Sequence, residues 1–222
     1  MDDCSLPAPF MTTYHPCLDD DGQRVVIRNP STATPLACWE DAHQIATVLP
    51  GGPLPAALNG LPFAPWQEAP TTPDGWSACV AGIGVDEPPF VLPPGMKAAA
   101  GAVILEDDGR VWLVAPSNGF GGYSATFPKG RVDPGTSLHC ASVREAFEES
   151  GLQVRVEAFL LDVRRTQTYT RYYIARRVGG SPACMDWESQ AVHLVPMDQL
   201  RQVAVNPNDA PVIAALESWL GR

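Results

Sequence analysis

Three glutamates stand close together on a predicted helix in the second half of the chain. Glu145, Glu148 and Glu149 are three and four residues apart, so a helix places them on one face within one turn. Carboxylates this close repel one another, and a hard divalent cation such as Mg²⁺ or Mn²⁺ would remove the repulsion. The trio therefore indicates a metal site. A solvated acidic helix face is the alternative, and the trio alone does not exclude it.

The loop before this helix has residue types suited to a metal and to phosphate. Gly130 and Gly135 permit backbone shapes that other residues resist, so the loop can bend back and offer the Gly130 carbonyl to a metal. Lys129 and Arg131 flank the bend, where a phosphate chain would need cations.

The whole segment resembles the Nudix box, Gly-x5-Glu-x7-Arg-Glu-U-x-Glu-Glu-x-Gly-U, in which U is a bulky aliphatic residue. The matching positions are Gly130, Arg144, Glu145, Glu148, Glu149, Gly151 and Leu152. Two positions depart from it, because Thr136 stands where the first Glu belongs and Ala146 where a bulky aliphatic residue belongs. The surrounding strand pattern extends the resemblance to about residues 97–205.

The resemblance implies a metal-dependent pyrophosphohydrolase that cleaves a nucleoside diphosphate linked to another group. Gly130, Glu145, Glu148 and Glu149 would hold Mg²⁺ or Mn²⁺, which would acidify a bound water. Arg144 would orient a glutamate of the box. The general base is a box glutamate such as Glu145 or Glu148, or a later one, for which Glu188 is the nearest candidate. The loss of a glutamate at Thr136 is expected to weaken metal binding.

The substrate is expected to be a small diphosphate compound, but the sequence specifies it weakly. Tyr169 and Arg171 alternate on one predicted strand and share a face, with Arg165 on the strand before it. Together with Lys129 and Arg131 they would clamp phosphates and stack a base. A tyrosine-rich strand that only packs the sheet is the alternative. Dinucleoside polyphosphates, diphosphoinositol polyphosphates and ADP-ribose-like compounds all stay open.

The elements that must position these residues form an α/β fold. We expect strands over 98–106, 110–115, 153–165, 168–178 and 191–195, with a tight turn at 107–109. Helices are expected over 137–150, ending at Gly151, and over 209–220. Strands on both sides of one central helix predict an α/β/α sandwich with a mixed β-sheet, which is the Nudix-type fold, over residues 97–222.

The first 96 residues differ in composition and are expected to form either a small, separate, proline-rich module or an extended arm. They hold 16 of the 23 prolines and carry a net charge of 2 − 11 = −9, whereas residues 97–222 carry 13 − 14 = −1. Residues 24–28 are predicted to be a strand and 34–49 a helix. Capping the active site, a homodimer contact and recruitment of another protein are all open roles.

Composition also limits the partners and the compartment. An acidic chain does not attract nucleic-acid phosphates at long range, so nucleic acid is an unlikely partner. The six cysteines lack zinc spacing and are expected to be free thiols. The acidic start lacks the features of a signal peptide, and no apolar run has the length of a membrane span. These features predict a cytoplasmic protein that does not enter the membrane.

Two rival functions remain open at this level. The first is a catalytically degenerate Nudix fold kept as a ligand sensor or protein-interaction module, which Thr136 and the motif-free N-terminal part favour. The intact carboxylate trio argues against it. The second is an RNA 5′-pyrophosphohydrolase, which would need a local basic groove that composition does not indicate.

Overall fold

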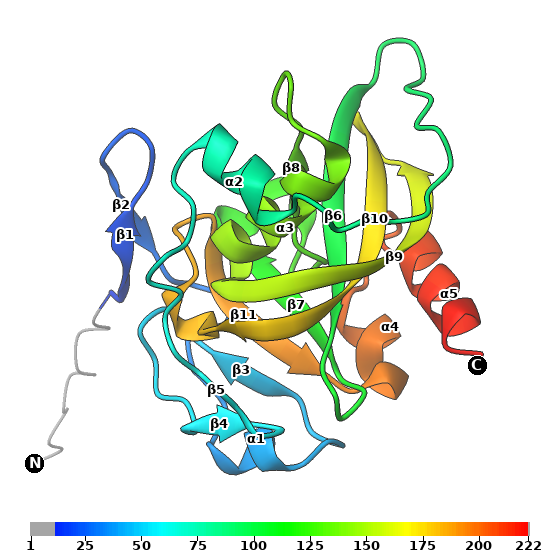
Figure 1. The fold of residues 1–222 in the computed structure, drawn as a ribbon. Helices are drawn as coiled ribbons and strands as arrows, with labels where there is room; N and C mark the ends of the chain where they lie inside the picture. Colours follow the sequence, from blue (N-terminus) through cyan, green and yellow to red (C-terminus); the bar gives the residue numbers. More distant parts are fainter. Residues whose placement is uncertain (1–11, 222) are drawn as a thin grey trace, which may run out of the picture.

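The computed structural model describes residues 12–221 and consists of one large mixed sheet with helices on both faces (Figure 1). The order of its strands is β3-β11-β7-β6-β10-β9, and β8 pairs with the start of β6. The strands are β1 Tyr14–Leu18, β2 Arg24–Val26, β3 Ala46–Val48, β4 Ala57–Leu58, β5 Leu61–Pro62, β6 Lys97–Leu105, β7 Val111–Pro116, β8 Lys129–Arg131, β9 Leu152–Arg164, β10 Thr168–Gly180 and β11 Ser189–Val195. The helices are α1 Ala37–Glu40, α2 Pro73–Cys79, α3 Leu138–Ser150, α4 Leu200–Val203 and α5 Ala210–Trp219, with short 3-10 turns η1 Ser117–Gly122, η2 Pro182–Cys184 and η3 Met197–Gln199.

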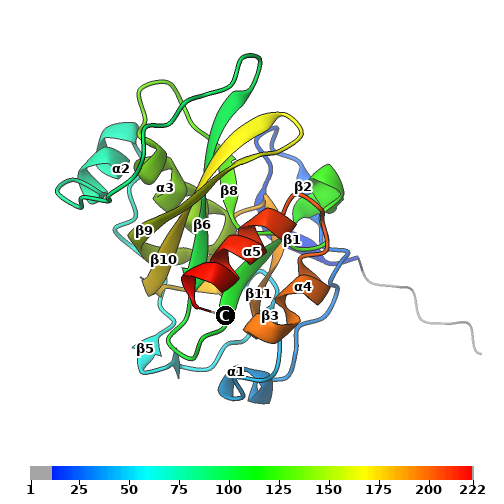
Figure 2. The same ribbon diagram turned by 90° about the vertical axis from the view of Figure 1, so that its right-hand side faces the viewer.

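The sheet separates two hydrophobic cores, which confirms the predicted sandwich. Helices α2 and α3 lie on one face, and α4 and α5 lie on the other (Figure 2). Val143 and Ala146 of α3 pack with Tyr173 of β10 on the first face. Val212 and Leu216 of α5 pack in the cluster on the second face. Burial on both faces explains why β6 and β7 consist of nearly continuous apolar residues.

Local sequence explains the ends of the central helix. The Ser137 hydroxyl accepts a hydrogen bond from the Cys140 amide at 3.1 Å and so caps the first turn of α3. Gly151 ends the helix with φ +68°, a left-handed conformation that glycine adopts without strain. The predicted strands, the 107–109 turn and both predicted helices of the C-terminal half are confirmed to within a few residues.

The N-terminal part differs from the prediction. Residues 24–26 form the expected strand, but the helix expected over 34–49 is limited to α1. Residues 46–48 instead form β3, which pairs antiparallel with β11 at the edge of the large sheet. Thr47 and Val48 are β-branched, and pairing with a neighbouring strand outweighs the weak helical pattern of this short stretch.

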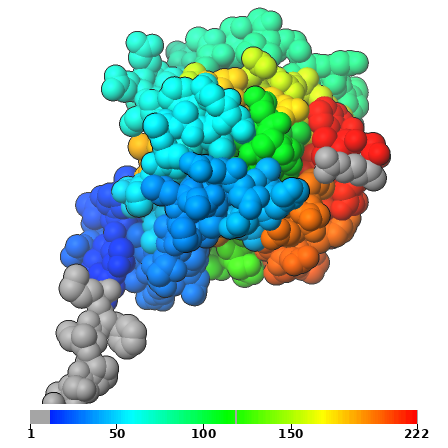
Figure 3. Space-filling view, turned by 90° about the horizontal axis from the view of Figure 1, so that it is seen from below, coloured from blue at the N-terminus to red at the C-terminus, as the bar shows by residue number. Residues whose placement is uncertain are grey.

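Residues 34–85 contribute to the same buried core as the later elements, and a boundary at residue 96 stays a prediction. Trp39, Val48 and Trp76 belong to the same buried cluster as Trp112 and Val143. Figure 3 shows this N-terminal segment spread over one end of the molecule, against the later elements. This acidic, proline-rich segment therefore covers part of the large sheet.

Two smaller expectations concern thiols and membranes. Five cysteines in the described part of the chain are free, as predicted, while Cys4 lies outside the described residues. Between residues 12 and 221 the structure contains no helix with the length and hydrophobicity needed to cross a membrane.

Candidate metal and active site

Three carboxylates converge where α3 passes the loop before β11. One oxygen each of Glu145, Glu149 and Glu188 lies within 4.8 Å of the other two. Glu145 is buried at 6% exposure, whereas Glu188 is exposed. Two glutamates of the predicted trio therefore belong to the cluster, and the third member is the later glutamate that was predicted as a candidate base. Glu148 lies outside this group and faces Arg144, with 3.7 Å between Oε2 and Nε.

Strand β8 packs against this cluster. Gly130 contacts the Glu145 side chain so closely that a Cβ at position 130 would overlap the Glu145 carboxylate. Glycine is required there by close approach, and its φ is not left-handed. The Lys129 amide donates a hydrogen bond to Glu149 Oε2 at 2.9 Å. Coordination by the Gly130 carbonyl stays a prediction.

Burial and mutual repulsion raise the pKa values of these carboxyl groups. Burial, followed by the charges of Glu149 and Glu148, raises the pKa of Glu145 to about 8. Burial raises the pKa of Glu149 to about 7, although Lys129 opposes the shift. Burial also raises the pKa of Glu148. The pKa of Glu188 is raised by partial desolvation of its carboxyl group and then by the charges of Asp20 and Asp186, although part of the residue stays exposed to solvent. Oxygen ligands this close, with unfavourable negative charge, are the donor set that Mg²⁺ or Mn²⁺ binds, so the residues fit the predicted metal.

Arg144 holds Glu145 from outside the cluster, as the resemblance implied. Its Nη2 donates to Glu145 Oε1 at 2.9 Å and to the Arg131 carbonyl at 3.2 Å. Its Nη1 donates to Asp133 Oδ2 at 2.5 Å. Sequence reasoning missed Asp133, although its place beside Pro134 and Gly135 in a turn was a usable signal.

The structure does not support Arg171 and Tyr169 as a substrate clamp. They share a face as predicted, but the guanidinium is 1% exposed and paired with Asp162 at 2.7 Å and with Glu87 at 3.2 Å. The Tyr169 ring packs on Phe90 with 5.4 Å between centroids. Residues 87–90 thus cover this face and satisfy its polar groups, so the alternative of a packing strand describes it better.

Arg165 is likewise engaged inside the protein. It donates to the hydroxyls of Tyr172 at 2.6 Å and Tyr123 at 2.7 Å, and it pairs with Asp209 at 3.0 Å. With 6% exposure it has little surface left for a phosphate. Asn208 donates to the same Tyr123 hydroxyl at 2.7 Å, so Arg165 and Asn208 together fix the position of the Tyr123 side chain.

Lys129 and Arg131 are the predicted phosphate-binding cations that remain beside the cluster. The Lys129 ammonium lies 5.6 Å from the centre of the Tyr123 ring, and its charge acts on both Glu149 and Glu188. Arg131 is exposed at the end of β8. Phosphate binding by these two side chains stays a prediction.

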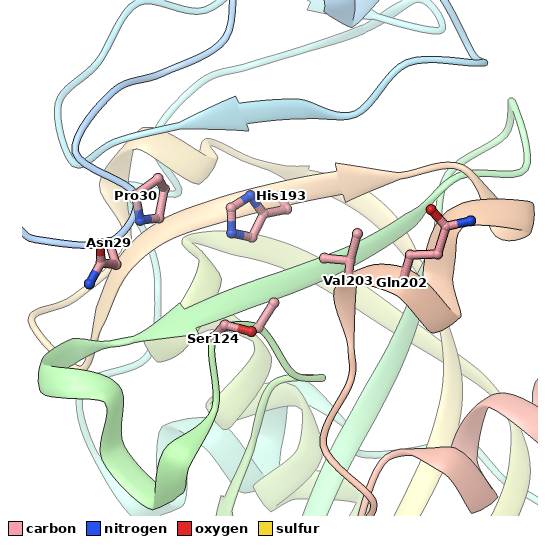
Figure 4. A pocket seen from close by; sticks show the side chains of 7 residues that line it. Asn29, Pro30, Ser124, His193, Gln202 and Val203 are labelled. Carbon is pink, nitrogen blue, oxygen red and sulfur yellow. The ribbon is translucent and has the colours of Figure 1, made fainter.

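His193 lines a separate hollow of about 300 Å³, which none of the clustered carboxylates reaches (Figure 4). Its Nδ1 lies 2.8 Å from the Thr47 hydroxyl, and burial lowers its pKa to about 4. The ring is therefore neutral and tied to β3. The metal-ligand group found among the described residues contains neither His193 nor His139.

Comparison with known families decides the assignment of this site. Residues 95–216, which are more than half of the chain, match the sequence model of the NUDIX domain. The chain belongs to the Nudix family. The box, the carboxylate cluster and every strand of the mixed sheet except β3 lie inside the matched range of this Nudix protein.

Individual relatives cover less of the molecule. RNA pyrophosphohydrolase from Cronobacter sakazakii is 30% identical over 121 residues, which are 53% of this chain and 60% of the relative. The protein of the same name from Caulobacter vibrioides is 39% identical over 59 residues, or 27% and 34% of the two chains. The chain thus spans about 60% or less of the curated relatives it matches.

Solved structures with a similar arrangement also align with part of the chain. A C. elegans Ap4A hydrolase binary complex has a TM-score of 0.47 and 20% identity, and covers 57% of this chain and 98% of its own. An ADP-ribose pyrophosphatase from Streptococcus suis has a TM-score of 0.45 and 21% identity, and covers 55% and 91%.

Proposed function

We propose that this Nudix protein is a metal-dependent pyrophosphohydrolase that cleaves a nucleoside-diphosphate-linked or related diphosphate compound. The observation that carries the proposal is the cluster of Glu145, Glu149 and Glu188 within 4.8 Å, with the pKa values of its buried members raised. A site built only for stability would not bring three carboxylates together in partial burial, because each buried charge is costly without a partner.

The residues divide the chemistry among them. Glu145 and Glu149 would hold Mg²⁺ or Mn²⁺, which supplies charge against the diphosphate and makes a nearby water more acidic. Lys129 and Arg131 would bind the outer phosphate oxygens. Glu188 is the exposed member of the cluster, and its raised pKa suits acceptance of a proton from the attacking water. Arg144 would keep the Glu145 carboxylate oriented.

The test is product release from a panel of diphosphate compounds with Mg²⁺, Mn²⁺ or EDTA. The panel holds ADP-ribose, NADH, diadenosine polyphosphates, nucleoside triphosphates, diphosphoinositol polyphosphates and 5′-triphosphate RNA. Turnover should require metal and should fall by roughly 10²–10⁴-fold in Glu188→Gln if that carboxylate is the base. Glu149→Gln should also lose turnover and bind Mn²⁺ more weakly. Glu157→Gln, in an exposed pair with Arg155 away from the cluster, is the matched control.

RNA 5′ ends are the second candidate substrate, and the relatives' names favour them. The relatives from C. sakazakii and C. vibrioides are both called RNA pyrophosphohydrolase. The −9 charge of residues 1–96 argues against a long nucleic-acid path. RNA turnover with steep salt dependence would select this candidate, whereas turnover of small compounds alone would reject it. Nucleotide binding without any metal-dependent turnover would contradict the enzyme and favour a ligand sensor.

A further inference from the structure

Position 136 lacks the carboxylate of the box, and the structure shows what surrounds it. Thr136 lies beside a hollow of about 120 Å³ between α2 and α3. Arg144 and Glu148 line the same hollow from α3, and Thr72 and Trp76 line it from α2. A side chain longer than threonine at position 136 would therefore extend into space that borders the Arg144 guanidinium.

A tight turn brings another carboxylate to this guanidinium. The Thr136 amide donates to the Asp133 carbonyl at 3.0 Å, and Gly135 between them has φ +84°. Pro134 and Gly135 are the residue types that this kind of turn prefers at its two central positions. The turn places positions 133 and 136 next to each other, so a carboxylate at either one can face Arg144.

Asp133 and Glu145 bind opposite ends of the same guanidinium. Asp133 Oδ2 accepts from Nη1 at 2.5 Å, and Glu145 Oε1 accepts from Nη2 at 2.9 Å. Because the guanidinium is planar and rigid, fixing one end fixes the direction of the other. Without Asp133 the nearest remaining carboxylate outside the cluster is Glu148, now 3.7 Å from Nε, and turning toward it would draw Nη2 away from Glu145.

We propose that Asp133 is a positioning residue that takes over at position 133 the task of the carboxylate missing at Thr136. It holds Arg144, and through Arg144 it orients the Glu145 carboxylate for metal. The inference rests on the proposed metal site but not on any particular substrate. It explains how this chain can keep an ordered site without the first glutamate of the box.

The energetics separate this role from a purely structural one. The Asp133 side chain is 60% exposed, and exposed ion pairs contribute little to stability because water screens them. Loss of Asp133 should therefore leave the Tm nearly unchanged. Metal affinity should respond more strongly, because residues that orient metal ligands typically change it by roughly 10–100-fold.

The experiment compares Asp133→Asn, Asp133→Ala, Thr136→Glu and the double variant Asp133→Ala/Thr136→Glu. Mn²⁺ affinity is measured by calorimetry without substrate, and the Arg144 side-chain N–H resonances are followed by NMR in metal-free protein. Asp107→Asn, an 80% exposed carboxylate at 4.0 Å from Arg176, is the control. Both single changes at 133 should weaken Mn²⁺ binding by roughly tenfold or more and shift the Arg144 resonances. The double variant should recover most of the Mn²⁺ affinity and most of the parent positions of the Arg144 resonances.

Several outcomes would overturn the inference. Mn²⁺ affinity and Arg144 resonances unchanged in Asp133→Asn would show that the contact positions nothing. Loss of affinity together with a large fall in Tm would make Asp133 a structural residue. If Thr136→Glu does not restore the Mn²⁺ affinity of a well-folded Asp133→Ala protein, then a carboxylate at position 136 does not do the task of Asp133. If the parent protein binds Mn²⁺ but turns over no compound of the panel, the proposed function fails. The role of Asp133 is decided even then, because the Mn²⁺ affinities and the Arg144 resonances are measured without substrate.

Discussion

The buried carboxylates of the metal site should make the metal-free protein sensitive to pH. Glu145 and Glu149 have folded-state pKa values of about 8 and 7, above the ordinary value of 4.5. Between those limits the unfolded chain has released protons that the folded protein still binds, so the contribution of these two groups to stability is greatest below pH 4.5 and falls as pH rises toward 8. Each pKa unit corresponds to about 1.4 kcal/mol, so the loss is on the order of a few kcal/mol.

Metal should oppose this loss, because it binds the ionised carboxylates. We expect Mg²⁺ or Mn²⁺ to raise the Tm strongly near pH 8 and little near pH 5, where protons compete with the metal. Glu145→Gln should raise the metal-free Tm near pH 8 and weaken the response to metal. Thermal melts with metal and with EDTA at several pH values test both points. A metal-free Tm that rises steadily from pH 5 to pH 8 would contradict this account.

Gly130 should be the least replaceable residue of the loop. A Cβ at this position would overlap the Glu145 carboxylate, so Gly130→Ala must displace either β8 or Glu145. We expect Mn²⁺ affinity and turnover to fall by at least tenfold, as for loss of other groups that orient metal ligands. Gly84→Ala is the control, since nothing lies within 4 Å of its Cβ position. Metal titration of both variants gives the answer, and equal affinities would refute the steric argument.

Sequence spacing predicted part of this site and could not predict the rest. The four-residue step from Glu145 to Glu149 is a local property of a helix, so their convergence follows from sequence. Glu188 joins them through tertiary packing, for which the chain carries no local signal. Strand alternation correctly placed Arg171 and Tyr169 on one face, but it could not reveal that residues 87–90 cover that face.

At the scale of elements, helix α3 is supported by two tryptophans that lie outside the family match. Trp66 and Trp76 pack against Phe147 of α3, with centroid distances of 5.2 and 5.9 Å. Trp76 belongs to α2 and is 6% exposed. Residues upstream of the Nudix domain thus brace the helix on which Glu145 and Glu149 lie, on the side away from the sheet.

Loss of this support should destabilise the protein and loosen the site. Trp76→Ala removes a buried indole, which typically costs about 3–5 kcal/mol, or roughly 6–20 °C in Tm for a chain of this size. Trp219→Ala, at a 42% exposed indole of α5, is the matched control and should cost far less. Calorimetric melts of the two variants compare them directly. Equal losses would mean that α2 does not brace α3.

The same scale shows where local pattern misled the prediction for residues 34–49. Thr34-Pro35 is an acceptable helix start, and a helix does begin at Ala37. It ends after four residues, where Arg110, in the turn between β6 and β7, donates to the backbone carbonyls of Cys38, Trp39, Asp41 and Gln44 at 2.7–3.3 Å. Carbonyls that point toward the guanidinium do not at the same time accept the hydrogen bonds of a continuing helix. The contact joins positions about 70 residues apart, which no local pattern reveals.

At the scale of the whole molecule, the charge and proline contrast at residue 96 does not mark two independent units. Strand β3 extends the edge of the sheet beside β11, and Trp39 and Trp112 lie 6.0 Å apart in one core. Without the first 96 residues, the edge of strand β11 and the side chains of Trp112 and Arg110, which are now buried, would be exposed. The composition of residues 1–96 was a correct observation, but composition alone could not reveal this shared core.

A cut in the connecting segment should therefore leave the two parts bound. A protease site placed at Gly82–Gly84, in an exposed turn between α2 and β6, would divide the chain without touching the shared core. We expect the cleaved parts to co-elute in size-exclusion chromatography and to keep Mn²⁺ affinity within about threefold, because the ligands of the site are untouched. Uncleaved protein with the same insertion is the control. Parts that separate, with a C-terminal part that keeps its parent Tm, would show that residues 1–96 are the independent module that their composition first indicated.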